Sequence, residues 1–304
     1  MKFIKRLLFA IILFGGFVLL YYKFNYFAIE KPNYKGYISI VDAIDIDDYA
    51  YISKKKSDIA KGELILVNNN TPYLFSENND LVCVYDNKKS CYKVSDLNVT
   101  LEERVMEPLN EMMQEFYNQY AIDAVTVISG HRSYDSQESL YNNKIVEDGE
   151  IEAVKWVAKP GGSEHHTGYA LDFGIYHNSG RSQDYKGNGK YQWINKNACR
   201  YGFVVRYPEE KEEQTNIEYE PWHFRYIGKP HSFIATEYNM CLEEYIEYLK
   251  EFQFGEKHLR VTDGDGKQYE IYYTDNLDVP VPTDKQYRIS GNNVDGFIVT
   301  VLDN

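Results

Sequence analysis

Apolar residues recur at intervals of three and four positions in the middle of the chain, which predicts a helix with one buried face. The pattern follows residues 100–103, whose Thr-x-x-Glu order matches a capping box and marks a helix start. Pro108 lies within the pattern, so the helix either kinks there or begins just before it. The apolar face carries Leu109, Met112, Met113, Phe116 and Tyr120. Further helices are expected over residues 135–146, 151–158, 192–200 and 237–252.

Short apolar runs bounded by polar turns predict strands that alternate with these helices. One run leads into residues 129–133, so Arg132 lies on a strand-to-helix loop, where functional side chains are commonly presented. We therefore expect an α+β fold in which mixed helices surround a central antiparallel sheet that carries the functional site. The expected strands are residues 64–67, 124–128, 171–175, 203–207 and 223–226.

The pattern changes after residue 256, where short strands follow one another closely. Residues 263–266 read Asp-Gly-Asp-Gly and residues 291–293 read Gly-Asn-Asn, and each sequence is a turn signal between two strands. We expect two hairpins there, forming a small β appendage over residues 256–304 after a catalytic domain over residues 62–255. The remaining acidic positions of a calcium loop are missing, which argues against a calcium site in the first turn.

The N-terminus combines a basic end with an apolar run. Lys2, Lys5 and Arg6 precede uncharged residues 7–22, and no small-x-small cleavage site follows the run. We interpret residues 1–26 as a cytoplasmic basic end and an uncleaved signal-anchor helix that spans the membrane. A cleaved signal peptide and a buried core helix are the alternatives. Residues 27–61 are mixed and polar, and we expect them to form a stalk or linker to an exported domain.

Composition narrows the class of protein. The formal net charge of −13 argues against sequence-independent binding to nucleic acid, which requires Lys and Arg against phosphates. The four cysteines form no C-x-x-C pair, so a thiolate zinc site is not expected. Cys83 and Cys91 flank residues 86–89, which have the composition of a turn. Both a disulfide across that turn and two unpaired thiols are compatible with the sequence.

Two segments carry side chains that suit a catalytic zinc ion. Residues 163–172 contain His165 and Asp172, separated by Gly168, which permits a sharp bend between a loop and the following strand. Residues 220–223 contain Glu220 and His223. Catalytic zinc takes three protein ligands and leaves a fourth position for water. A single histidine is more often structural, but the joint pattern is restrictive, so we predict that His165, Asp172 and His223 bind Zn²⁺, with Glu220 handling protons.

The joint pattern S-x-H-x-x-G-x-A-x-D followed by E-x-x-H resembles the zinc D,D-peptidases of the VanY, VanX and LAS type. Residues 129–134 with Gln137 resemble the arginine segment of that family, and residues 220–226 resemble its second metal segment. Residues 289–296 resemble the tail of some VanY-type D,D-carboxypeptidases. The resemblance therefore covers nearly the whole exported part of the chain.

The resemblance implies a role for each matching residue. His165, Asp172 and His223 match the zinc ligands, and Glu220 matches the catalytic base. Arg132 matches the arginine that stabilises the developing oxyanion. The remaining matches are Ser163 and Gln137, at positions near the terminal residue of the substrate. His131 and His166 match no ligand position.

The implied function is a zinc D,D-carboxypeptidase, anchored on the outer face of the cell membrane. Its substrate would be a peptidoglycan peptide ending in D-Ala-D-Ala, and resemblance to VanY implies a part in glycopeptide resistance. No protein partner is indicated. One rival is a serine D,D-peptidase, because residues 53–56 formally match S-x-x-K, although in a lysine run. A membrane-anchored protein that binds cell-wall peptides without cleaving them is the other.

Overall fold

The computed structural model describes residues 34–42, 48–75 and 80–303. Its central feature is a six-stranded sheet in the order β4-β6-β7-β10-β9, with β8 also paired to β7. All pairs are antiparallel except β4 with β6, so the expected α+β fold around a mainly antiparallel sheet is confirmed. The strands are β4 (Lys93–Val94), β6 (Val125–Ser129), β7 (Ala170–Tyr176), β8 (Ser182–Asp184), β9 (Phe203–Tyr207) and β10 (Glu220–Tyr226).

The long helix α3 (Glu103–Tyr120) covers one face of this sheet. The capping box expected at Thr100 is wrong: Thr100–Glu102 form strand β5, and the helix begins at Glu103 without a side-chain cap. Pro108 is accommodated within its first two turns. Its apolar face meets alternate residues of β6, β7 and β10 in one buried cluster. The cluster includes Met113, Phe116, Val127, Leu171, Phe173 and Phe224. Because alternate strand residues point to opposite faces, this packing leaves the other face of the sheet for the functional site.

The remaining helices are shorter, and two expectations about local structure are wrong. The helix expected over residues 237–252 is shorter, α9 (Leu242–Leu249). The preceding helix α8 (His231–Glu237) ends where it was expected to begin, and Asn239 between them has a left-handed backbone with φ of 52°. Residues 64–67 are buried but form no strand. The other helices are α2 (Val84–Asn87), α4 (Tyr134–Asp148), α5 (Glu150–Trp156), α6 (Gln192–Asn197) and α7 (Glu212–Thr215).

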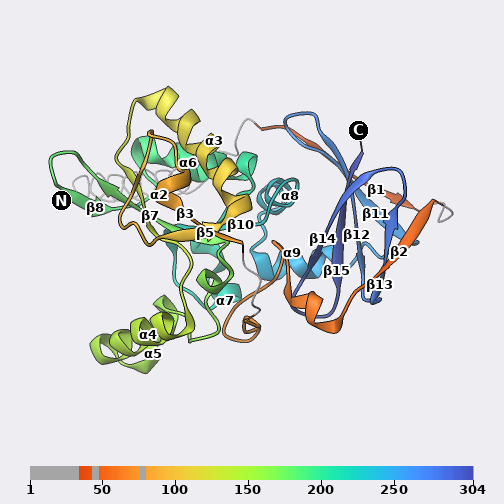
Figure 1. Cartoon of the computed structure of the whole chain (residues 1–304), viewed down its shortest axis with the longest axis horizontal. Coiled ribbons are helices and arrows are strands. Elements are labelled where there is room, and N and C mark those ends of the chain that lie inside the picture. The colour runs from red at the N-terminus through yellow and green to blue at the C-terminus, as the bar shows by residue number, and fades with distance from the viewer. Residues whose placement is uncertain (1–33, 43–47, 76–79, 304) are drawn as a thin grey trace, which may run out of the picture. The chain divides into compact units, whose positions relative to one another are not determined.

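The C-terminal segment forms a second antiparallel sheet in the order β1-β11-β12-β15-β14. The two expected hairpins are present as β11–β12 and β14–β15. Strands from early in the chain take part: β1 pairs with β11 in this sheet, and β2 pairs with β13 in a separate two-stranded sheet, as the orange and blue ribbons in Figure 1 show. The strands are β1 (Tyr37–Asp42), β2 (Tyr49–Ser53), β11 (Lys257–Thr262), β12 (Gln268–Thr274), β13 (Asp278–Pro282), β14 (Gln286–Gly291) and β15 (Phe297–Asp303). Part of the range expected to be a stalk is therefore sheet.

The second sheet shares a core with the last helices of the catalytic segment. Tyr245, Ile246 and Leu249 of α9 pack in one buried cluster with Leu259 and Ile271 of the sheet. A second connection comes from the loop after β14, where the side-chain amide of Asn293 donates to the carbonyl oxygens of Leu66 and Pro72 at 2.9 and 3.1 Å. Residues 256–304 are thus integrated with the preceding chain by apolar and polar contacts.

Two further expectations concern a membrane-spanning helix and a disulfide. Within the described ranges no helix is both long enough and apolar enough to cross a membrane. The signal anchor expected over residues 1–26 lies outside the described residues.

Cys83, Cys91, Cys199 and Cys241 are all free thiols, so the structure contains no disulfide between the first two. Residues 84–87 between them form α2, overlapping the expected turn.

Candidate active site

The pairing of β7 with β10 brings two of the predicted metal ligands together. Asp172 and His223 are direct partners in this antiparallel pair. Their neighbours Leu171, Phe173 and Phe224 point into the core beneath α3. Alternation therefore directs Asp172 and His223 to the opposite face, side by side, which is where cross-strand partners interact most closely.

His165 reaches the same face from a single turn of 3-10 helix, η2 (Glu164–Thr167). Gly168 ends this turn with a left-handed φ of 74°, and a Cβ at that position would lie 2.7 Å from Leu81. The sharp bend expected at this glycine is thus confirmed. Nδ1 of His165 lies 2.6 Å from the carbonyl oxygen of Gly130, which fixes Nδ1 as the protonated nitrogen and leaves Nε2 with a free lone pair.

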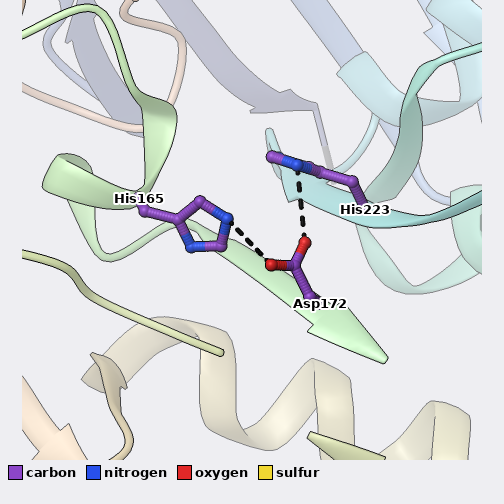
Figure 2. A group of neighbouring side chains, drawn as sticks. All are labelled: His165, Asp172 and His223. Carbon is purple, nitrogen blue, oxygen red and sulfur yellow. Dashed lines mark ion pairs between the residues drawn. The ribbon is translucent and has the colours of Figure 1, made fainter. Parts of the chain in front are cut away.

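The three side chains converge around one point, as Figure 2 shows. His165 Nε2 lies 3.2 Å from Asp172 Oδ2, and His223 Nδ1 lies 3.5 Å from Asp172 Oδ1. One ligand atom from each residue falls within 4.8 Å of the others. Burial by itself raises the pKa of Asp172, but His165, His223 and Arg132 outweigh burial and lower that pKa below its ordinary value. The carboxylate is therefore ionised and available as a ligand.

The arrangement fits a divalent ion such as zinc. A free lone pair on His165 facing a carboxylate oxygen is repulsive unless a cation lies between them. Tetrahedral zinc with bonds of about 2.0–2.1 Å separates its ligand atoms by about 3.4 Å, close to the two distances found here. Asp172 Oδ1 is buried and makes no hydrogen bond to any described residue, as expected of an atom that coordinates a metal.

Glu220 faces this cluster because β10 is irregular. Strict alternation would put Glu220 and His223 on opposite faces, since they are three residues apart. The pairing of β10 with β9 shifts register between Glu220 and Phe224, and this irregularity allows both side chains to lie on one side. Glu220 Oε2 lies 3.1 Å from His223 Nδ1. Burial raises the pKa of Glu220, which suits a group that must take up and release a proton.

Arg132 completes the charged set from the loop after β6. Its guanidinium group donates to Gln137 Oε1 at 2.7 Å and to Ser129 Oγ at 2.9 Å, and it lies 3.8 Å from Asp172 Oδ2. The amide of Gln137 in turn donates to the carbonyl oxygen of Ala158 at 2.7 Å. The guanidinium group is thus held rigidly beside the metal ligands, and Gln137 is engaged in orienting it.

These residues line a cavity of about 260 Å³. Ser163, predicted near the end of the substrate, is a lining residue and is buried. His166 is not a lining residue: Nδ1 donates to the carbonyl oxygen of Arg132 at 2.7 Å and Nε2 accepts from Gly161 N–H at 3.1 Å. His131 is also absent from the lining. The sequence analysis did not identify the lining residues Lys144, Trp156, Tyr207 and Trp222.

Sequence analysis also missed a buried ionic network behind His223. The carboxylate of Glu164, next to the ligand His165, accepts from Arg206 Nε at 2.7 Å and lies 3.2 Å from Arg225 Nη1. Arg206 also forms a two-pronged pair with Glu243 of α9. The signal in the sequence was Glu164 itself, an acidic residue between Ser163 and His165 of the predicted metal segment.

Comparison with known proteins agrees with this geometry. A family model described as VanY, D-alanyl-D-alanine carboxypeptidase, matches residues 98–229. A D-alanyl-D-alanine carboxypeptidase from Enterococcus faecium is 37% identical over 253 residues, which span 81% of this chain and 77% of the relative. The chain belongs to the VanY family of D-alanyl-D-alanine carboxypeptidases.

Solved structures place the VanY fold over most of the chain. The vancomycin-resistance D,D-dipeptidase VanXYg, in complex with a D-Ala-D-Ala phosphinate analogue, is 30% identical with a TM-score of 0.69. The match covers 88% of this chain and 100% of that one. A vancomycin-resistance D,D-pentapeptidase VanY mutant in complex with Zn(II) is 28% identical, with a TM-score of 0.51. That match covers 60% of this chain and 98% of the other.

The serine residue of the rival mechanism lies away from the catalytic cavity. Ser53 ends strand β2, which pairs with β13, and its hydroxyl group donates to Asp278 at 2.6 Å. It is not among the residues that line the catalytic cavity. The formal S-x-x-K match is therefore an edge-strand serine followed by the half-buried Lys54 and the exposed Lys55 and Lys56.

Proposed function

We propose that this VanY-family protein is a zinc D,D-carboxypeptidase that removes the terminal D-Ala from peptidoglycan peptides ending in D-Ala-D-Ala. The observation that carries the proposal is the convergence of His165, Asp172 and His223 within 4.8 Å, beside a buried glutamate and a fixed arginine. The names of the Enterococcus faecium relative and of the Zn(II)-bound VanY support the substrate and the metal. The role of VanY in vancomycin-resistance cassettes extends the proposal to glycopeptide resistance.

His165, Asp172 and His223 would hold the zinc ion. When bound, zinc lowers the pKa of water to about 7 and polarises a carbonyl oxygen. Glu220, buried at the edge of the ligand cluster, takes the proton from the attacking water. It then delivers that proton to the amine of the departing D-Ala, so that one carboxylate serves both halves of the hydrolysis.

Arg132 stabilises the negative charge that develops on the carbonyl oxygen under attack. Its contacts with Gln137 and Ser129 hold the guanidinium group in place before the substrate arrives, so little reorganisation is needed during the reaction. Ser163, at the wall of the cavity, offers a hydroxyl group to the terminal carboxylate of the substrate. Gln137 acts on the substrate indirectly, by accepting a hydrogen bond that positions Arg132.

We expect Arg132→Met to lower kcat by about 10²–10³-fold, the usual effect of removing one oxyanion donor. Arg132→Lys retains the charge but cannot reproduce both hydrogen bonds, so its activity should fall between those of the Met variant and the wild type. The measurement is the rate of D-Ala release from a pentapeptide. A Met variant within tenfold of the wild type would exclude Arg132 from charge stabilisation.

Substrate class is tested with two stem peptides. A pentapeptide ending in D-Ala-D-Ala and the matching tetrapeptide, which ends in a single D-Ala after an L-residue, are incubated with the enzyme, and free D-Ala is quantified. The proposal predicts release from the pentapeptide and little or none from the tetrapeptide. Preferential release from the tetrapeptide would identify an L,D-carboxypeptidase instead, and no release from either would support a binding protein without activity.

A peptidoglycan substrate supports a location outside the cytoplasmic membrane. We propose that residues 1–26 anchor it there and that residues 62–255 carry the catalytic site, with residues 256–304 and the early strands forming a bracing sheet. A basic end followed by an uncharged run supports the anchor. Cell fractionation tests it: the full chain should be recovered with membranes, and a chain lacking residues 1–26 should not.

A further inference from the structure

Glu164 is a buried carboxylate that the proposed reaction leaves without a role. Its side chain is fully buried, as are those of Arg206 and Arg225 that flank it. Oε1 faces both arginines. Oε2 makes no hydrogen bond to any described residue and lies 3.8 Å from Nε2 of His223, which is also buried without a hydrogen-bond partner in the described chain. Two orphaned polar atoms therefore face each other.

The two nitrogens of His223 have different surroundings. Nδ1 faces the metal cluster, 3.5 Å from Asp172 Oδ1 and 3.1 Å from Glu220 Oε2. Nε2 points away from the cluster toward Glu164. A metal-binding histidine coordinates through the nitrogen that lacks a proton, and the partner of the other nitrogen decides which one that is. With a metal ion on Nδ1 the ring proton is on Nε2, and the carboxylate of Glu164, which can only accept a hydrogen bond, is the group that faces this nitrogen.

We propose that Glu164 is a positioning residue for His223. Its negative charge, 3.8 Å from Nε2, favours a proton on that nitrogen, which leaves Nδ1 free to bind the metal and sets the orientation of the ring. This inference rests on the proposed zinc-dependent function, because it assigns the second contact of one of the zinc ligands. The segment that supplies ligand His165 thus also orients ligand His223 through the residue immediately before it.

The surrounding charges keep this carboxylate in place. Arg206 joins Glu164 to Glu243 of α9, and Arg225 donates to the backbone carbonyl oxygens of Glu63 and Ile65 at 3.0 Å. Two carboxylates and two guanidinium groups balance in charge. Buried ion pairs contribute little net stability compared with apolar packing, because desolvation offsets their attraction. Orienting the ring of His223 would explain why this network is present beside a metal site although its desolvation costs free energy.

The test compares zinc binding by the full chain carrying Glu164→Gln with binding by a matched variant, Glu243→Gln. Both substitutions remove one carboxylate from Arg206, but only Glu164 faces His223. Dissociation constants are measured by competition with a chromophoric chelator, and the unfolding temperature of the metal-free protein is recorded in parallel. Loss of a group that hydrogen-bonds a metal ligand typically weakens metal binding 10–100-fold.

We expect Glu164→Gln to weaken zinc binding by about 10–100-fold and Glu243→Gln to change it by less than about threefold. Equal weakening in both variants, or none in Glu164→Gln, overturns the inference. If Glu164→Gln does not fold, Glu164→Asp keeps the charge but withdraws the carboxylate from His223, and it should also bind zinc more weakly. Failure of the wild-type chain to bind zinc would instead contradict the proposed function, so the two failures are distinguishable.

Discussion

Glu220→Gln should lower kcat for D-Ala release by about 10²–10⁴-fold, the contribution typical of a positioned general acid–base group. The amide matches the carboxylate in size but cannot take up the proton of the attacking water. Glu220 is not needed as a metal ligand in this account, so the zinc dissociation constant should change little. The measurements are steady-state kinetics on a pentapeptide and chelator competition on the same preparation.

A matched control is available two residues away. Glu218 lies on the same segment as Glu220 but does not line the catalytic cavity, so Glu218→Gln should retain wild-type kinetics. Unchanged turnover in Glu220→Gln would remove the glutamate from the mechanism. A large loss of zinc binding in that variant would mean that Glu220 acts as a ligand rather than as a base.

Asp172→Asn is expected to abolish activity through loss of the metal. Asp172 lies between His165 and His223, at 3.2 and 3.5 Å from their nitrogens, and supplies the only carboxylate of the ligand set. The neutral amide is a much weaker ligand, so the zinc dissociation constant should rise by more than about 100-fold, beyond the effect of changing a group that only supports a ligand. Metal content after dialysis and chelator competition measure it.

The control for this change is Asp184→Asn, on the exposed strand β8 that pairs with β7. It removes a carboxylate from the same sheet without touching the ligand cluster and should bind zinc normally. An Asp172→Asn variant that keeps full zinc affinity would show that the cluster found here is not the metal site.

The elements that carry the candidate site were predictable because their patterns are local. Alternation of core and non-core residues in β7 and β10 fixes the side of the sheet for Asp172 and His223. The bend at Gly168 follows from its freedom to adopt a positive φ. The resemblance to VanY then supplied the expected roles, and the structure brings the ligand atoms of the three predicted residues together.

Other features depend on contacts between distant parts of the chain and left little local signal. The contact of Glu164 with Arg206 joins residues 42 positions apart, and Asn293 contacts Leu66 across 227 positions. The β1 and β2 strands lie in a polar segment whose pairing partners come more than 200 residues later. The irregularity that allows Glu220 to lie on the side of His223 likewise arises in the pairing with β9, so sequence spacing alone did not predict it.

The central claim is that one zinc ion held by His165, Asp172 and His223 drives D-Ala release. The most direct test removes metal from the purified full chain with a chelator and returns zinc in measured steps, following D-Ala release from a pentapeptide. We expect no release without metal and activity that rises in proportion to bound zinc until one ion per chain is reached. Full activity in metal-free protein, or recovery that requires no zinc, would contradict it.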